Sequence, residues 1–294
     1  YSQVESAESK LKKKESILYF DEDWNIVSSK YNAEYYRIFK IGINNSSEGK
    51  IKDYFKSGKI QNVIEKAIYI DLEDDENWKF DGLSKSYYET GELESKFIYV
   101  DDKREGFYKK YYKSGKLEFV KEYKNGLLNG NRSFYRESGK LELIEEFKNG
   151  LLNGNISFYN ESGKLESIEE YKNGLLNGNI STYRESGKLE SIEEYKNDDF
   201  ISKKKYNKDG ILILHFKTNN KDIWERHQFY ESGEKRDIAE AIWDDNGDMY
   251  LDGLYKVYYK TGQLKESGVY KKDSLNGTSF LYSKKGKIIY EVKY

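Results

Sequence analysis

Apolar and polar positions recur along this chain with a fixed period. Between Lys121 and Asn197 the segment E-(Y/F)-K-N-G-L-L-N-G-N is written three times, starting at Glu122, Glu146 and Glu170. The glycines of the S-G-K tripeptides around these copies are 24 residues apart: Gly115, Gly139, Gly163 and Gly187. A short fixed period predicts a stack of small units, each contacting mainly its neighbours.

Ten glycines fix the register of ten repeats: Gly58, Gly91, Gly115, Gly139, Gly163, Gly187, Gly210, Gly233, Gly262 and Gly286. We count positions from this turn glycine. Position −4 is aromatic in every repeat, and position +2 is Leu or Ile except at Lys235. Position −9 is a second glycine in eight repeats, with Ile201 and Trp224 in the other two. The unit is therefore G-x4-Y-x-x-S-G-K-L.

Two secondary structures compete for this unit. In a central copy four apolar residues also fall at helical spacing: Leu165, Ile168, Tyr171 and Leu175. The last copy instead alternates with a period of two, at Ile288, Tyr290, Val292 and Tyr294. An S-G-K turn between two such runs favours a hairpin whose glycine takes a positive φ. We therefore predict two strands per repeat.

The Asn-Gly of each K-N-G-L-L segment suits the return turn to the next hairpin. We predict an all-β fold, an elongated and twisted antiparallel meander of about ten hairpin repeats. We also predict that the −4 aromatics and the +2 leucines share a face and account for most of the apolar burial.

The chain divides into three predicted parts. Residues 1–16 form a polar leader that we expect to fray. Residues 17–48 are a lead-in, with a hairpin turning at residues 21–24 and then a strand. Residues 49–294 are a continuous repeat array, broken by acidic insertions near residues 71–79 and 243–248 that we expect to be solvated loops.

Composition narrows the function classes. Aromatic residues make up 16% and charged residues 35% of the chain, which suits a thin structure with much wetted surface. A net charge of −2 offers no global attraction to nucleic acid. The start at Tyr1 without Met favours an exported, periplasmic or cell-surface protein, with a cytoplasmic location as the alternative. Abundant Lys, Asn and Ile with no Pro indicates a bacterial, AT-rich genome.

No catalytic, cofactor or metal site is predicted. The chain has no Cys, and its two histidines, His215 and His227, fit packing or solvated roles. An EF-hand centred on Gly247 would place Ile242 at the first ligand, so that motif fails. The repeated glutamate pairs 145/146, 169/170 and 193/194 are interpreted as a charge ladder with nearby lysines: Lys140, Lys148, Lys164 and Lys172.

The G-x4-Y-x-x-S-G-K-L hairpin followed by Y-x-N-G-x-x-x-G resembles the bacterial MORN-repeat variant often called the YwqK type. The resemblance covers about residues 49–294 and implies an elongated hairpin array that serves as a scaffold or interaction surface, with no catalytic residues. Some family members are labelled antitoxins or immunity proteins, and eukaryotic relatives have been linked to lipid headgroups and partner proteins. This chain departs from the pattern at Asn197-Asp198-Asp199, where the N-G turn is lost, and at Ile201 and Trp224. We therefore expect the sheet to bend or alter between Asp198 and Gly247.

Two surfaces are candidates for binding. The first is the −3 position, aromatic in the outer repeats: Phe55, Tyr88, Tyr112, Tyr230 and Tyr259. In the middle repeats this position is Arg136, Asn160, Arg184 or Asn207, so the outer aromatics either pack as end caps or bind a peptide or glycan. The rival surface is an apolar row at position +5: Val120, Ile144, Ile168 and Ile192.

These features predict a non-enzymatic repeat scaffold that binds a protein partner. The first alternative is an antitoxin or immunity protein that neutralises a toxin. A third possibility, a lipid-headgroup binder, requires a one-sided basic stripe, for which the only short candidate is Lys203-Lys204-Lys205.

Overall fold

A computed structural model describes residues 14–41, 47–69, 78–218, 223–243 and 248–294. Residues 1–13 of the predicted leader lie outside this description, as do residues 70–77 and 244–247 of the two acidic insertions. The chain divides into two compact units, Tyr1–Leu151 and Leu152–Tyr294, and each is described by itself.

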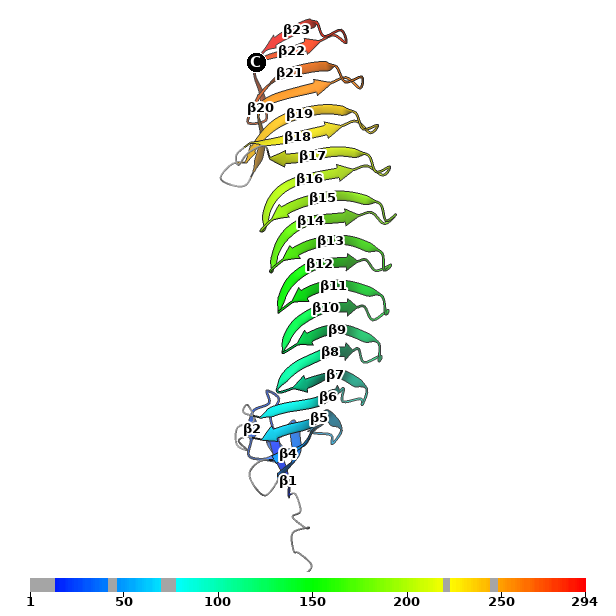
Figure 1. Cartoon of the computed structure of the whole chain (residues 1–294), viewed down its shortest axis with the longest axis vertical. Coiled ribbons are helices and arrows are strands. Elements are labelled where there is room, and N and C mark those ends of the chain that lie inside the picture. Colours follow the sequence, from blue (N-terminus) through cyan, green and yellow to red (C-terminus); the bar gives the residue numbers. More distant parts are fainter. Residues whose placement is uncertain (1–13, 42–46, 70–77, 219–222, 244–247) are drawn as a thin grey trace, which may run out of the picture. The chain divides into compact units, whose positions relative to one another are not determined.

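The described part of the first unit is almost entirely strand (Figure 1). Its strands are β1 (Lys14–Phe20), β2 (Ile26–Val27), β3 (Tyr35–Ile41), β4 (Ser47–Phe55), β5 (Ile60–Tyr69), β6 (Lys79–Tyr87), β7 (Leu93–Val100), β8 (Lys103–Tyr111), β9 (Leu117–Lys124), β10 (Leu127–Tyr135) and β11 (Leu141–Lys148). A single 3₁₀ turn, η1 (Lys30–Asn32), precedes β3. Each strand from β3 onward pairs antiparallel with the next, and β1 pairs with both β2 and β3.

The second unit continues the same pattern. Its strands are β12 (Leu151–Tyr159, whose first residue belongs to the first unit), β13 (Leu165–Lys172), β14 (Leu175–Tyr183), β15 (Leu189–Lys196), β16 (Asp199–Tyr206), β17 (Leu212–Thr218), β18 (Trp224–Phe229), β19 (Lys235–Trp243), β20 (Met249–Tyr258), β21 (Leu264–Lys271), β22 (Ser274–Tyr282) and β23 (Ile288–Lys293). Every strand pairs antiparallel with its sequence neighbour. The predicted all-β antiparallel meander of hairpin repeats is confirmed, and the helical alternative is wrong.

Each hairpin closes through the predicted turn glycine. In the repeat of Gly163, the Gly163 N–H donates to the Asn160 carbonyl at 2.8 Å, and the Asn160 N–H donates to the Lys164 carbonyl at 2.9 Å. Gly163 has φ +86°, and the ladder shifts by one residue beside it, between Phe158 and Tyr159. This is a tight turn followed by a glycine bulge, which a residue with a Cβ adopts only under strain.

We expect Gly163→Val to lower the free energy of unfolding by about 1–3 kcal/mol, because a β-branched residue is strained at this φ. Lys164→Ala is the matched control, since it changes the adjacent turn residue without changing the backbone requirement, and it should cost about 0.5 kcal/mol or less. Urea unfolding of the two variants measures both values. Equal losses would contradict the assignment of this turn.

In the described ranges, return turns such as that at Asn125 and Gly126 join one hairpin to the next with two residues at positive φ. Asn125 and Gly126 have φ of 52° and 84°, which is the geometry expected for Asn-Gly. The Gly126 N–H then donates to the Arg104 carbonyl of the preceding turn at 2.9 Å. Successive return turns are thus linked by backbone hydrogen bonds, as at Gly150 to Leu128 and Gly174 to Leu152.

The expected loss of the return turn at Asn197-Asp198 is wrong. Both residues keep positive φ, of 52° and 70°, and the Asp198 N–H still donates to Leu176 at 2.9 Å. The Asp198 carboxylate also accepts from the Leu176 N–H at 2.8 Å. Asp273 does the same for Leu251 at 2.7 Å. The extra bond offsets the strain of a non-glycine residue in the left-handed region.

The strand pairing assigns side chains to two faces of each unit. We call the face carrying positions +4, +6, +8, −5, −7 and −9 the inner face, and the face carrying +2, +5, +7, −4, −6 and −8 the outer face. Tyr159 pairs with Leu165, so the predicted sharing of one face by positions −4 and +2 is confirmed, and this is the outer face.

The prediction that this face holds most of the apolar burial is wrong. The buried apolar side chains of the regular repeats lie mainly on the inner face, as at Phe119, Ile156, Phe216 and Tyr255. In the first unit the rings of Phe97, Tyr108, Phe119 and Phe134 follow one another on this face, with centroids 5.0–5.8 Å apart. The strands curve (Figure 1), so side chains on one side of the sheet converge while those on the other side spread apart.

The second motif glycine, at position −9, is explained by the residues packed around it. A Cβ at Gly178 would lie 2.6 Å from the Cβ of Glu170, whose carboxylate accepts from the Asn179 N–H at 3.1 Å. On the inner face Gly178 pairs with Tyr195. Six repeats pair the −9 glycine with an aromatic residue in this way, and a seventh shows the inverse, with the large residue at position −9 and a small one opposite. The inverse occurs where Trp224, which replaces the glycine, pairs with Ala241.

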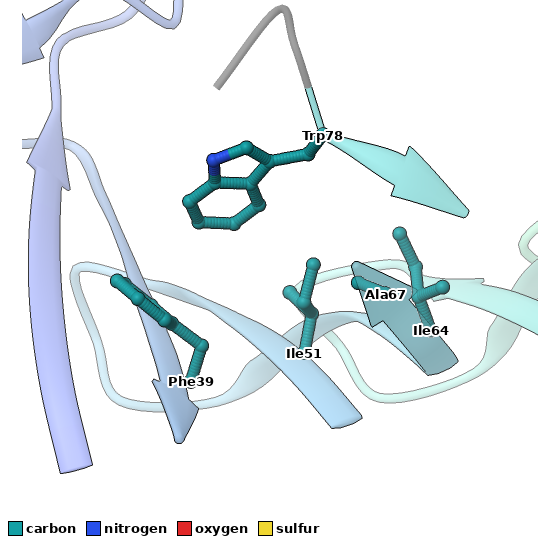
Figure 2. Close-up of a cluster of buried hydrophobic side chains, with 5 residues drawn as sticks. All are labelled: Phe39, Ile51, Ile64, Ala67 and Trp78. Carbon is teal, nitrogen blue, oxygen red and sulfur yellow. The ribbon is translucent and has the colours of Figure 1, made fainter. Parts of the chain in front are cut away.

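The lead-in forms a compact core with the first repeat. The predicted turn at residues 21–24 and the strand after it are present, as β1, β2 and β3. Figure 2 shows Trp78 lying over Phe39 and Ile51, with Ile64 and Ala67 beside them. Trp78 is only 2% exposed, so the end of the first insertion is core, contrary to the expected solvated loop.

Candidate interaction surfaces

The −3 tyrosines lie along the hairpin-turn edge of each unit. The Tyr88 hydroxyl donates to the Tyr111 carbonyl and the Tyr112 hydroxyl to the Tyr135 carbonyl, each at 2.7 Å. Tyr230 and Tyr259 donate in the same way to the −4 residues of the following repeats, at 2.9 and 2.8 Å. Burial raises the pKa of Tyr88 and Tyr112, so these hydroxyls stay protonated as donors.

The remaining member of that surface, Phe55, has no hydroxyl and packs on the lead-in. Its ring centroid is 6.0 Å from that of Tyr35, which in turn stacks on Trp24 at 4.6 Å. In a middle repeat Arg184 replaces the tyrosine and donates to the Tyr206 carbonyl at 2.7 Å. Inter-repeat bonding therefore accounts for position −3 in both repeat types, and partner binding by these tyrosines stays a prediction.

Removing one such hydroxyl tests the structural role. We expect Tyr112→Phe to lower the free energy of unfolding by about 0.5–1.5 kcal/mol, because the Tyr135 carbonyl loses its donor while the ring stays. Tyr108→Phe, on the inner face of β8, which ends just before Tyr112, is the control, since no hydrogen bond of its hydroxyl is found among the described residues. Thermal unfolding compares the two. Equal midpoints for both variants and the unchanged protein would contradict the role.

The rival apolar row lies on the outer face, where serines separate its members. In the first unit Val120 and Ile144 both pair with Ser133. In the second unit Ile168 pairs with Ser157 and Ser181, and Ile192 pairs with Ser181. All four apolar side chains are half-buried. Each unit therefore carries part of the row, without the close ring packing of the inner face.

Lys203-Lys204-Lys205 does not make a one-sided stripe. Alternation along β16 places Lys204 opposite Ile192 on the outer face and its two neighbours on the inner face. Lys203 pairs with Glu193 at 2.6 Å across the sheet. The sequence-based candidate for a lipid headgroup stripe is therefore wrong.

A basic row that sequence reasoning missed lies elsewhere, on the outer face of the first unit. Lys85 pairs with Lys96, and Lys96 pairs with Lys109, on the adjacent strands β6, β7 and β8. We call these three residues the lysine row. Lys85 and Lys109 occupy position −6 of consecutive repeats and Lys96 occupies position +5, and the strand register places Lys96 between the other two.

The glutamate pairs are divided between the two faces. Glu169 lies on the inner face and accepts from the Tyr171 hydroxyl at 2.9 Å, while Glu170 lies on the outer face beside Gly178. Burial and the Glu169 bond raise the pKa of Tyr171 to about 12. Glu145 is buried and paired with Arg132. The predicted cross-strand pairing of charges is present at Glu145 with Arg132 and at Glu193 with Lys203, but these partners are not the lysines that the sequence suggested.

The two histidines form a cross-strand pair on the outer face of the second unit. His215 pairs with His227, whose ring nitrogen lies 2.7 Å from a Glu225 oxygen. Burial, with help from Lys204, lowers the pKa of His215. Among the described residues, no group of three or more acidic, His or Cys side chains could hold a metal ion. No helix in the same ranges is long and apolar enough to cross a membrane.

A comparison of the sequence with protein-family models finds one family model that matches several of the hairpin repeats. The model described as MORN repeat variant matches residues 80–101, 104–125, 128–149, 152–173, 176–197 and 251–272. Six repeats of this chain are therefore similar to the MORN repeat variant. Each matched segment contains a turn glycine with its two strands. The match omits the first and last repeats, those of Gly58 and Gly286, and the repeats of Gly210 and Gly233, where Ile201 and Trp224 replace the −9 glycine.

Comparisons with whole proteins add little to the MORN assignment. No curated protein matches the sequence. The crystal structure of TcdB2-TccC3-TEV is similar over 95% of this chain, with 10% identity and a TM-score of 0.20. This chain spans 17% of that chain's length, and a TM-score this low supports no conclusion about function.

Proposed function

We propose that this chain is a repeat scaffold of the bacterial YwqK type, exported from the cell, that binds a protein partner through its outer face and catalyses no reaction. The observation that supports the proposal most is the outer apolar row. MORN repeats occur in scaffold proteins, and here the array leaves one regular surface whose apolar side chains are not used in the core.

The inner face supports the proposal by contrast. Its rings pack against each other, and some of its charged groups are paired, as Glu145 is with Arg132 and Glu193 with Lys203. The outer row has half-buried aliphatic side chains separated by serines, so it offers apolar contacts and hydroxyl groups together. Protein interfaces combine these two kinds of group.

The test uses two adjacent residues of β14 that lie on opposite faces. A photo-reactive benzoylphenylalanine replaces either Ser181, beside Ile168 on the outer face, or Thr182 on the inner face. An aromatic residue is tolerated at the inner position, because Phe134 and Phe158 occupy it in other repeats. Each purified variant is irradiated in an extract of the source cell.

We expect the Ser181 variant to form a covalent adduct with one defined protein, identified by mass spectrometry, and the Thr182 variant to form none. Thermal midpoints of both variants close to that of the unchanged chain ensure that the comparison is made on folded protein. An adduct of the same protein at Thr182 alone, or none at either position, would contradict binding through the outer face.

A further inference from the structure

The lysine row brings three like charges together without partners. Lys85, Lys96 and Lys109 occupy directly opposed positions on three neighbouring strands, which places their Cβ atoms about 5 Å apart in succession. Within the described ranges, the ion pairs do not include any of these three residues. Like charges directly opposite each other destabilise a sheet, so folding alone gives no reason for this row.

The adjacent residue Lys110 shows the contrast. It lies on the inner face, where its ammonium group meets the Glu118 carboxylate at 3.2 Å. Lys109 and Lys110 are neighbours on β8 but lie on opposite faces. The inner lysine, Lys110, is paired with a carboxylate, whereas the outer one, Lys109, has no ion pair among the described residues. An unneutralised cluster of one sign attracts a partner of the other sign.

Exposed apolar side chains flank the row. Ile98, two residues after Lys96, is 45% exposed, and Phe107, two residues before Lys109, is 56% exposed. The Lys109 ammonium lies 5.9 Å from the centre of the Phe107 ring. The patch thus combines cations with uncovered apolar surface, which suits a partner that carries both carboxylates and apolar side chains.

Carboxylates of the protein itself limit the lysine row on one side. Glu105 pairs with Ile98 and Glu122 pairs with Phe107, so carboxylates border the row along its β8 and β9 edge. An extended peptide crossing the strands offers side chains on one side about every 6.8 Å, close enough for flexible lysines to meet alternate residues.

We propose that the lysine row, with Ile98 and Phe107, docks an extended acidic segment of the protein partner in which Asp or Glu alternates with apolar residues. This inference rests on the proposed function and names the chemistry of the partner. The adjoining apolar row, beginning at Val120 opposite Lys109, continues the same outer face within the first unit.

The test measures binding of fluorescein-labelled poly-L-glutamate to the full chain by fluorescence anisotropy. The test variant is K85Q/K96Q/K109Q. The matched control is K113Q/K124Q/K148Q, which removes the same number of charges from exposed positions in a turn or at a strand end of the same unit. Competition by phosphatidylserine vesicles and by heparin tests the other anionic sources.

We expect the test variant to lose about tenfold or more in affinity for poly-L-glutamate, and the control about threefold or less. The thermal midpoint of the test variant should stay or rise, because the like-charge row is removed. Equal losses in both triple variants would overturn the inference. So would vesicles or heparin binding more tightly than poly-L-glutamate in a manner that depends on the lysine row.

Failure of the acidic-segment inference can be distinguished from failure of the proposed partner binding. If the Ser181 variant cross-links its partner equally well with and without K85Q/K96Q/K109Q, the inference fails while partner binding through the outer face stands. If no cross-link forms but poly-L-glutamate binding needs the lysine row, the acidic preference stands and the proposed partner binding fails.

Discussion

Replacing Asp53 by alanine is expected to lower the free energy of unfolding of the first unit by about 3–5 kcal/mol, because Arg37 would remain charged and buried without its carboxylate. Arg37 is 8% exposed and Asp53 is 1% exposed. The Arg37 Nε donates to Asp53 at 2.7 Å, and the Asn62 amide donates to the same carboxylate at 3.3 Å. Urea unfolding followed by tryptophan fluorescence measures the loss, since Trp24 and Trp78 both lie near Arg37.

The double variant Arg37→Met/Asp53→Leu is the control. Removing both charges avoids an unpaired buried ion, so this variant should be more stable than Asp53→Ala. The Arg37 guanidinium also lies 5.2 Å from the Phe20 ring and 5.0 Å from that of Trp78, so Met preserves part of the packing. A loss below about 1 kcal/mol in Asp53→Ala would contradict the role assigned to this ion pair.

The second large effect is expected in the second unit. Trp224→Gly should cost about 3–5 kcal/mol, because a tryptophan that is 9% exposed is removed from an aromatic cluster. Its ring stacks on Phe216 at 4.9 Å and on Phe200 at 5.5 Å. The change is measured by urea unfolding.

Ala241→Tyr should restore part of this loss when it is combined with Trp224→Gly. The pair then becomes the glycine and aromatic pair of the regular repeats, such as Gly178 with Tyr195, and the tyrosine covers the glycine across the strands. Trp243→Gly is the control, since Trp243 is 45% exposed and should cost less. A double variant no more stable than Trp224→Gly would contradict the exchange of volumes across this pair.

The hairpin repeats were predictable because turn chemistry is local. A turn with a glycine at positive φ, such as Gly163, is recognisable from a few consecutive residues. Ten copies of this turn indicated where each strand begins and ends. The faces were harder to assign, because the bulge beside each turn shifts the alternation by one residue. The sequence correctly predicted that positions −4 and +2 share a face. It wrongly predicted that this outer face, and not the inner one, holds most of the buried apolar side chains.

The charged groups show the same limit. Arg37 and Asp53 meet across β3 and β4, and the lysine row crosses three strands, so both contacts depend on how the strands pair. A signal for the lysine row was present, since the outer +5 and −6 positions change from Val, Ile and Ser in the central repeats to Lys in the earlier ones. Recognising these lysines as one row required the pairing of β6, β7 and β8, which only the structure supplies.

The exchange at Trp224 carried a partial signal. Its replacement of glycine was visible in the sequence, and the small residue at Ala241 stands where other repeats have an aromatic. Their direct pairing shows why the sheet continues through this repeat without the glycine.

Amine labelling of the lysines tests most directly whether the inner face stabilises the fold while the outer face binds the partner. Two pairs of adjacent lysines on opposite faces serve as internal controls: Lys109 with Lys110, and Lys204 with Lys203. Labelling rates are compared by mass spectrometry with and without the cross-linked partner. We expect Lys109 and Lys204 to lose reactivity in the complex while Lys110 and Lys203 keep theirs. Protection of Lys110 and Lys203 alone would contradict binding through the outer face.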